Sequence, residues 1–340
     1  MKNTKSLLTG NIGIVLMLIL FAASMMVKSR YSQEIFVQLF LWAGLGCAWN
    51  LNCGYCRRNS IGHAVFFGFG AYSTALIYSR TPLSPWIGML VGVALCAVIA
   101  LGLGRATLRL RGIFFTLTTQ AFGEVVHILS VSMKNVTNGS QGIVLKYVPG
   151  IMNMTFESKR AYIIMAFIYM MVMLILCIRL EHSKFGYQLI AIGQDTEAAQ
   201  VLGVNSAKVM TKSYVESAIA TAIGGSIYAM YYLYIDPDSV FGTNQVSLQF
   251  VLIGLVGGMG LAYGPILGAC ILIPLSNILR AQFAGISGLN GFAYGLIMLL
   301  IVMARPDGLL SYISYLWHKF LDGRGSGGAD SELDIGKEVT

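Results

Sequence analysis

Charged residues are scarce in this chain. Asp, Glu, Lys and Arg together make up 11% of its 340 residues, whereas soluble domains carry roughly 25%. Hydrophobic residues make up 56%, and the mean hydropathy is +0.70. So little charge excludes an ordinary soluble domain. We expect an all-α, polytopic membrane protein, because a helix satisfies its own backbone hydrogen bonds inside lipid.

The sequence also lacks the motifs of nucleotide chemistry and metal catalysis. It contains no G-x-x-x-x-G-K-[ST] stretch, so the chain does not bind ATP through a P-loop, and its four histidines form no H-E-x-x-H motif. Cys53 and Cys56 form a C-x-x-C pair with His63 following, but no second pair completes a zinc site. We therefore expect no catalytic residue, no metal ion and no cofactor bound by this chain itself.

Apolar runs long enough to cross a hydrocarbon core of about 30 Å recur along the chain. They predict about ten transmembrane helices. The stretch from 247 to 280 leaves two alternatives: two crossings joined by a tight turn at 257–260, or one crossing and a re-entrant segment. The predicted crossings are 11–28, 35–53, 61–79, 86–106, 112–132, 161–179, 213–234, 247–260, 264–280 and 288–304.

The basic residues predict an orientation. The net charge of +8 reflects Lys and Arg beside anionic lipid, so we expect no nucleic acid partner. An even number of crossings puts both termini on one side, and a cytoplasmic N-terminus assigns 15 of the 23 Lys and Arg residues to the cytoplasm. The loops 133–160 and 235–246, the second with Asp236 and Asp238, are then external.

The cytoplasmic loop 180–212 contains a short helix with clear end signals. Asp195 is a typical N-cap, Glu197 places negative charge in the first turn, and Gly203 suits the left-handed position after the last turn. A capped helix in the loop of a membrane protein indicates a docking element for another protein. The alternative is an amphipathic segment that lies on the lipid headgroups.

Glycine patterns and buried charge point to a transport pathway. Two glycine-interrupted stretches, 62–72 and 257–268, lie in corresponding places of the two halves, as in transporters built from repeats. Glu124 lies near the middle of its span. It either lines a polar pathway or contacts a cationic group, or else it pairs with His127 or caps polar backbone at a kink. Other glycines four residues apart predict close helix packing; examples are Gly88 with Gly92 and Gly291 with Gly295.

Four stretches taken in order resemble one family. They are SIGHAVFFGFGAY from residue 60, LRLRGIFFTLTT from residue 108, SKFGYQLIAI from residue 183, and GGMG from residue 257 through GPILGA from residue 264. Over about residues 41–310 the chain is similar to the permease subunits of branched-chain amino-acid ABC importers, the LivM type. Arg57 and Arg58 depart from the pattern, because the family usually has small or uncharged residues there.

The resemblance implies an ABC importer permease fold and a transport function. The chain would move leucine, isoleucine, valine or related small amino acids across the bacterial inner membrane. Alternatives are the same role for urea or short amides, or a stand-alone ion-coupled secondary transporter in which Glu124 and His127 relay protons. The implied partners are cytoplasmic ABC ATPase subunits that bind ATP and Mg, a second homologous permease subunit, an extracytoplasmic substrate-binding protein and membrane lipid.

The expected organisation and site residues follow. Residues 1–34 form an N-terminal segment with the first helix, 35–310 the permease domain with its coupling loop at 180–212, and 311–340 a largely disordered cytoplasmic tail. The residues expected to couple to the ATPase are Ser183, Gly186, Ala191, Asp195, Ala198, Ala199 and Gly203. Those expected along the translocation pathway are Gly62, His63, Tyr72, Thr118, Glu124, Gly257 and Gly258.

Overall fold

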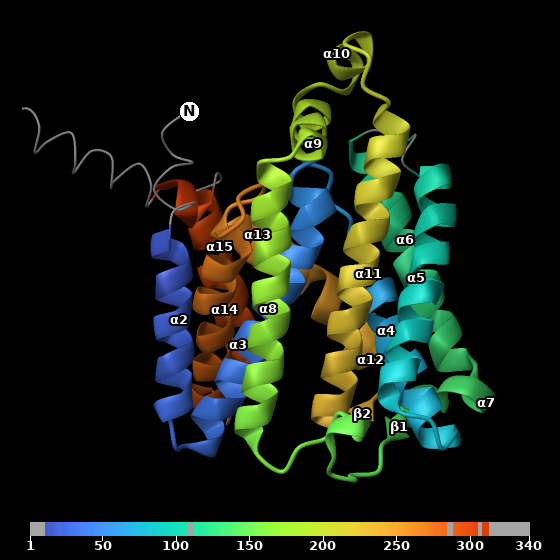
Figure 1. The fold of residues 1–340 in the computed structure, drawn as a ribbon, viewed down its shortest axis with the longest axis vertical. Helices are drawn as coiled ribbons and strands as arrows, with labels where there is room; N and C mark the ends of the chain where they lie inside the picture. The colour runs from blue at the N-terminus through green and yellow to red at the C-terminus, as the bar shows by residue number, and fades with distance from the viewer. Residues whose placement is uncertain (1–10, 108–109, 111, 284–287, 305–307, 313–340) are drawn as a thin grey trace, which may run out of the picture.

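The described part of the protein is a bundle of helices (Figure 1). A computed structural model describes residues 11–107, 110, 112–283, 288–304 and 308–312. In these residues the only strands are the short β1 (Ile143–Val144) and β2 (Tyr234–Ile235), which pair antiparallel. The helices are α2 (Asn11–Met26), α3 (Arg30–Trp49), η1 (Asn50–Gly54), α4 (Ala64–Arg80), α5 (Pro85–Thr107), α6 (Ile113–Ser132), α7 (Lys134–Thr137), η2 (Gly139–Gln141), η3 (Ile151–Asn153), α8 (Lys159–Glu181), α9 (Lys184–Gln194), α10 (Thr196–Val201), α11 (Ser206–Tyr232), α12 (Pro237–Phe241), η4 (Thr243–Ser247), α13 (Leu248–Gly257), α14 (Gly264–Gln282) and α15 (Leu289–Ala304).

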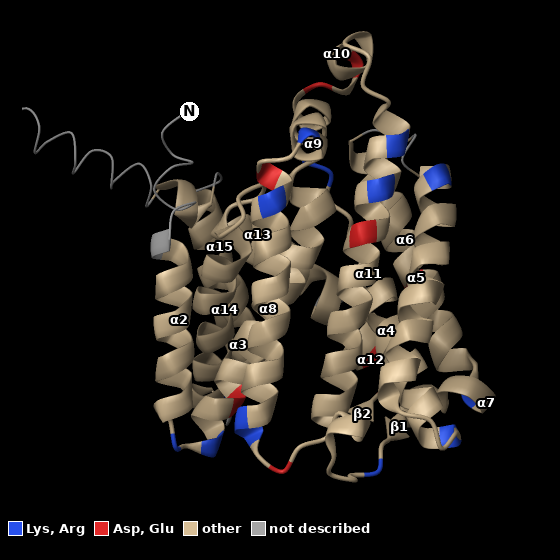
Figure 2. Ribbon diagram, viewed as in Figure 1, with Lys and Arg blue, Asp and Glu red and all other residues tan. Residues whose placement is uncertain are grey.

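Several of these helices have the length and composition of membrane spans. Five candidates occur in the described residues: α3 continued by η1, and α5, α6, α8 and α14. Three shorter apolar helices accompany them at Gly13–Met26, Gln245–Gly257 and Leu289–Ala304. Charged residues gather near the two ends of the bundle (Figure 2). The all-α polytopic fold is therefore confirmed. Each of the ten predicted crossings overlaps a helix, but the count of ten crossings stays a prediction.

The two ends of the bundle differ. In Figure 1, α9 and α10 extend beyond one end, and α2 begins and α15 ends at that same end. The β1–β2 pair lies at the opposite end. This arrangement is the one that an even number of crossings requires. The N-terminal residues 1–10 and all but the first two residues of the tail predicted to be disordered (311–340) lie outside the described residues.

Glycine contacts draw α4, α5 and α11 together. A methyl group on Gly225 of α11 would overlap the Phe67 carbonyl of α4, and a Cβ on Gly88 would lie 2.7 Å from the Cα atom of Thr74. The close packing predicted for Gly88 is thus confirmed. The prediction is wrong for Gly291 and Gly295 within this chain, since a Cβ built there would meet no described atom within 4 Å beyond its chain neighbours and the adjacent backbone of its own helix.

The stretch 235–246 is not the external loop that we expected. It contains α12 and most of η4 and packs against α4 and α6. Val240 and Phe241 are buried, and the Phe241 ring stacks on Tyr72 with 5.5 Å between centroids. The Ser247 hydroxyl then accepts a 3.2 Å hydrogen bond from the Ala64 N–H. The crossing predicted at 247–260 is therefore a broken helix that begins at Pro237. The first half of this broken helix contains polar residues, so its hydropathy is too low to predict it as part of a crossing.

A tight turn joins α13 to α14. Gly258 and Gly260 have φ values of +121° and +75° there, a left-handed conformation that favours glycine. A Cβ on Gly257 would overlap the carbonyl of Gly264 across the turn. The structure thus has the helix–turn–helix of the first alternative for 247–280, and the glycines predicted to lie on a pathway shape this turn.

Candidate functional site

The coupling segment, residues 183–203, forms two helices that project from the bundle (Figure 1). Ser183 starts α9, because its hydroxyl accepts a 2.9 Å hydrogen bond from the Gly186 N–H. Asp195 starts α10: its Oδ1 accepts hydrogen bonds from the N–H groups of Glu197 at 2.8 Å and Ala198 at 3.1 Å. Gly203 follows with φ +86°. The helix and caps predicted at 195–203 are confirmed, whereas the coupling role stays a prediction.

The surface of α10 combines a packed side with an exposed apolar side. Ala199 is buried and Ala198 is exposed. Val201 and Leu202, at the end of the helix, are 87% and 82% exposed. Exposed apolar residues that project from a helix end mark a contact surface when they gather at one place.

The sequence argument missed α9 as a helix. Its signal was available, because the Ser183 cap precedes apolar residues with helical spacing, and Leu189 and Ile192 are buried. Gly186 is also buried, and a methyl group there would overlap the Leu180 carbonyl. Ala191 lies on the same helix and is half-buried. The coupling segment therefore packs closely onto the end of α8.

Glu181 is a buried carboxylate at the junction of α8 with the coupling segment. Its side chain is 7% exposed. Oε1 accepts a 3.2 Å hydrogen bond from the Tyr55 hydroxyl and a 2.7 Å hydrogen bond from the Ala262 N–H. Sequence reasoning missed this residue. The available signal was an acid in the last helical turn, where the helix dipole disfavours negative charge.

Asn50 makes a second connection to the same turn. Its Oδ1 accepts a 2.9 Å hydrogen bond from the Gly260 N–H, and its Nδ2 donates to the Leu261 carbonyl at 3.1 Å. Together, Glu181 and Asn50 connect the coupling segment and the end of α3 to the α13–α14 turn. These hydrogen bonds hold the α13–α14 turn against the ends of α8 and α3.

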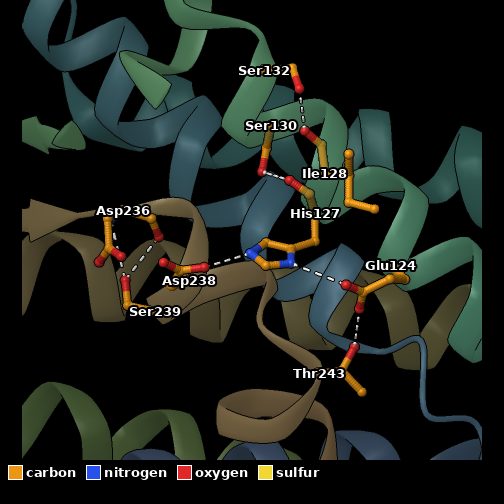
Figure 3. A network of polar contacts seen from close by, with 9 residues as sticks. All are labelled: Glu124, His127, Ile128, Ser130, Ser132, Asp236, Asp238, Ser239 and Thr243. Carbon is orange, nitrogen blue, oxygen red and sulfur yellow. Dashed lines mark hydrogen bonds and ion pairs between the residues drawn. The ribbon is translucent and has the colours of Figure 1, made fainter. Parts of the chain in front are cut away.

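A polar network links α6 with the broken helix (Figure 3). His127 Nε2 lies 2.7 Å from Asp238 Oδ1, and His127 Nδ1 lies 3.7 Å from Glu124 Oε1. The Thr243 hydroxyl donates to Glu124 Oε2 at 3.3 Å. The predicted pairing of Glu124 with His127 is confirmed. Asp238 and Thr243 were not expected, because they come from the stretch predicted to be an external loop.

The two carboxylates of this network remain accessible. The side chains of Glu124 and Asp238 are 53% and 62% exposed, whereas that of His127 is 18% exposed. On the same helix Leu117, Val125 and Ile128 are exposed. Carboxylates in the middle of a spanning helix need water or protein beside them. The structure thus leaves both carboxylates exposed, and the pathway role of Glu124 stays a prediction.

The other predicted pathway residues divide between core and surface. Thr118 is half-buried on α6. His63 is fully buried, and its Nε2 lies 2.9 Å from the Ser217 hydroxyl, which donates to the Ala48 carbonyl. A methyl group on Gly62 would overlap the Thr119 carbonyl. Gly62, His63, Tyr72 and the turn residues Gly257 and Gly258 are thus buried, and their place on a translocation pathway stays a prediction.

The cysteines offer no metal centre among the residues described. Cys53 and Cys56 are buried free thiols. Within the described ranges no three His, Cys, Asp or Glu side chains are placed to hold a metal ion.

Comparisons with known proteins agree on one family. Residues 31–303 match the family described as branched-chain amino acid transport system, permease component. The chain is 26% identical over 320 residues to the high-affinity branched-chain amino acid transport system permease protein LivM of Escherichia coli (strain K12), which covers 87% of this chain and 74% of that protein. It is 22% identical over 329 residues to a probable LivM of Methanocaldococcus jannaschii, covering 82% and 94%.

A shorter similarity involves a second type of permease. The chain is 25% identical over 138 residues to LivH of Escherichia coli (strain K12), covering 41% of this chain and 43% of that protein. No solved structure matches this chain significantly.

Proposed function

The chain belongs to the family of branched-chain amino acid transport permease components, and we propose that it is one permease subunit of an ATP-driven importer for leucine, isoleucine, valine or related small amino acids. It resides in the bacterial inner membrane with both termini in the cytoplasm. Cytoplasmic ABC ATPase subunits bind ATP and Mg, a substrate-binding protein delivers the cargo outside, and a second homologous permease completes the pathway.

The observation that carries this proposal is the projecting, capped α10 with Val201 and Leu202 exposed at its end. Those side chains suit an apolar pocket on an ATPase subunit. Asp195 and Gly203 define where the helix begins and ends, so the docking surface keeps its shape while it is pulled.

Force from the ATPase would then travel through named contacts. The coupling segment packs on α8, where Glu181 binds Ala262 in the α13–α14 turn. Helix α13 continues backwards through η4 to α12, which carries Asp238. The hydrogen bond from His127 Nε2 to Asp238 Oδ1 joins this broken helix to α6. ATP-driven movement of α9 and α10 thus alters the polar network in the middle of the bundle.

The exposed face of α6 supports a pathway shared with the second permease. Glu124 and Asp238 place carboxylate oxygens on this face, and an amino acid presents an ammonium group that carboxylates bind. Leu117, Val125 and Ile128 surround them with apolar surface suited to an aliphatic side chain. A second subunit that covers this face would enclose a path for a zwitterion with an apolar side chain.

Transport by reconstituted subunits tests the proposal. The full chain is co-expressed with its neighbouring ATPase, permease and binding-protein genes and reconstituted into proteoliposomes. We expect leucine uptake that requires ATP and the binding protein and resists a protonophore. Uptake by this chain alone, abolished by a protonophore, would replace the importer with the ion-coupled transporter. Uptake of urea or a short amide in preference to leucine would retain the ABC importer assignment and change its substrate.

A further inference from the structure

A groove with basic side chains lies between α5 and α11, at the end of the bundle that carries α9 and α10. Figure 2 shows the basic residues of both helices near this end, with an acidic residue of α11 further along the helix. The groove has a volume of about 680 Å³. Its lining includes Leu101 and Arg105 from α5 and Lys208, Lys212, Val215 and Glu216 from α11.

The charges in this basic groove are not balanced. Glu216 is the acid of the lining, and it lies 3.8 Å from Lys212. Among the residues described, neither Arg105 nor Lys208 has a carboxylate within ion-pair distance. The lining thus carries an excess of positive charge, which favours an anionic ligand.

The lower wall of the groove is apolar and continues along the outside of α5. Leu101 is 40% exposed, and Val98, Leu95 and Val91 follow it along the helix with 67%, 40% and 46% exposed. The spacing of three and four residues places Val91, Leu95 and Val98 on one face. A ligand with a charged head and an apolar tail fits this combination better than a small anion does.

We propose that the basic groove binds the phosphate of an anionic phospholipid, whose acyl chains lie along the exposed face of α5. Basic pockets between spanning helices at the membrane surface recognise such headgroups. The aliphatic part of each Lys and Arg lies along the apolar wall while its charged end reaches the phosphate.

The bound lipid contacts the machinery of coupling. Lys212 Nζ lies 4.5 Å from the centre of the Phe185 ring in α9. A phosphate that binds Lys212 would compete with its contact to Phe185 and so change the position of α9 relative to α11. This role is separate from the cargo of the transporter, so it does not depend on which amino acid is carried.

Native mass spectrometry of the full chain in mild detergent tests the proposal. The chain is titrated with phosphatidylglycerol and with phosphatidylethanolamine of the same acyl composition. We expect tighter binding of phosphatidylglycerol. The double variant Arg105→Gln/Lys208→Gln should bind it about 30-fold more weakly, since each basic side chain near the surface contributes about fivefold. Glu216→Gln should bind it more tightly, so the two variants shift affinity in opposite directions.

Arg179→Gln, in the last turn of α8, removes an exposed basic residue outside the groove and serves as the matched control with unchanged affinity. Equal affinity of the unmodified chain for both lipids would overturn the proposal, and so would unchanged phosphatidylglycerol binding in the double variant. Full displacement of the lipid by millimolar inorganic phosphate would assign the groove to a free anion. Chemical acetylation of Lys208 in the assembled transporter distinguishes a further outcome. If the ATPase protects Lys208 from the reagent and lipid does not, the groove is a protein contact.

Discussion

The buried carboxylate of Glu181 accepts a 2.7 Å hydrogen bond from the backbone N–H of Ala262, 81 residues further along the chain. One partner ends α8 directly before the coupling segment, and the other lies in the turn between α13 and α14. This bond therefore connects the end of α8, next to the proposed ATPase contact, to the turn that follows the broken helix.

Glu181→Ala should uncouple ATP hydrolysis from transport. The substitution leaves the Ala262 N–H without this acceptor, which costs about 1–3 kcal/mol in a buried site. We expect uptake to fall at least tenfold while the ATPase rate of the complex persists, and Glu181→Gln to restore part of the uptake because its amide oxygen still accepts. Glu157→Gln, exposed in the loop before α8, is the control. Normal coupling in Glu181→Ala would remove this residue from the mechanism.

Charge or polarity on the exposed side of α10 should prevent ATPase binding. Leu202→Asp changes a side chain that is 82% exposed, so the bundle itself should stay folded. We expect a pull-down of the tagged chain to lose the ATPase subunits and keep the second permease. Val144→Asp, 74% exposed in β1 at the opposite end, is the matched control. Recovery of the ATPase with Leu202→Asp would contradict the docking role.

Ala198→Arg together with Ala199→Arg should also uncouple hydrolysis from uptake, and Gly203→Pro should do the same. The structure predicts different effects for the two arginine substitutions. Ala198 is exposed, so its arginine acts on the contact, whereas Ala199 is buried and its arginine must disturb the packing of α10. We expect Ala198→Arg alone to leave thermal stability unchanged and Ala199→Arg to lower it. Normal uptake in the double variant or in Gly203→Pro would argue against the coupling role.

The polar network should contribute to substrate passage and not only to packing. Asp238→Asn removes the negative charge opposite His127, and Glu124→Gln removes the other carboxylate. We expect each to lower leucine uptake by about an order of magnitude, the scale of one lost charge-assisted hydrogen bond. In the complex, uptake should still require ATP and resist a protonophore. Unchanged uptake kinetics in both variants would confine the network to a structural role.

The same substitution should destabilise the protein at one glycine and not at another. Gly225→Ala brings a methyl group against the Phe67 carbonyl, and overpacking of this kind costs about 1–3 kcal/mol. We expect a lower melting temperature and less folded protein in detergent. Gly295→Ala faces open space within the chain and should leave its melting temperature unchanged. Equal stability of the two variants would show that α4 and α11 can move apart to fit the methyl group without loss of stability.

Local signals predicted some elements well. The helix at 196–201 was predictable because Asp195 bonds to groups two and three residues away, and such contacts lie within one stretch of sequence. Hydropathy likewise located each apolar helix. Helix α9 was missed although Ser183 caps it, since its apolar spacing is short and was interpreted as part of a loop.

Other features needed contacts between distant residues. Carboxylates lower local hydropathy and so place Asp238 in a predicted external loop, yet its partner is His127 of α6, 111 residues earlier in the chain. His63 lies in a glycine-rich stretch, and its local sequence does not show that the rings of Phe66, Tyr214 and Phe250 surround it. The local spacing of polar and apolar residues does not show whether a polar residue such as Asp238 or His63 is exposed or buried.

The sequence by itself determined an all-helical membrane protein, because composition, apolar length and helix caps act over a few turns of chain, and the order of its four motifs carries the resemblance to a permease family. Tertiary structure alone decided that Pro237 to Ser247 folds back between helices, that Glu181 joins the coupling segment to the α13–α14 turn, and that Glu124 stays exposed on α6. Each of these depends on which helix packs against which. Helix pairing is decided by glycine contacts and buried hydrogen bonds between residues far apart in the chain. The sequence next to each residue does not identify its distant partner.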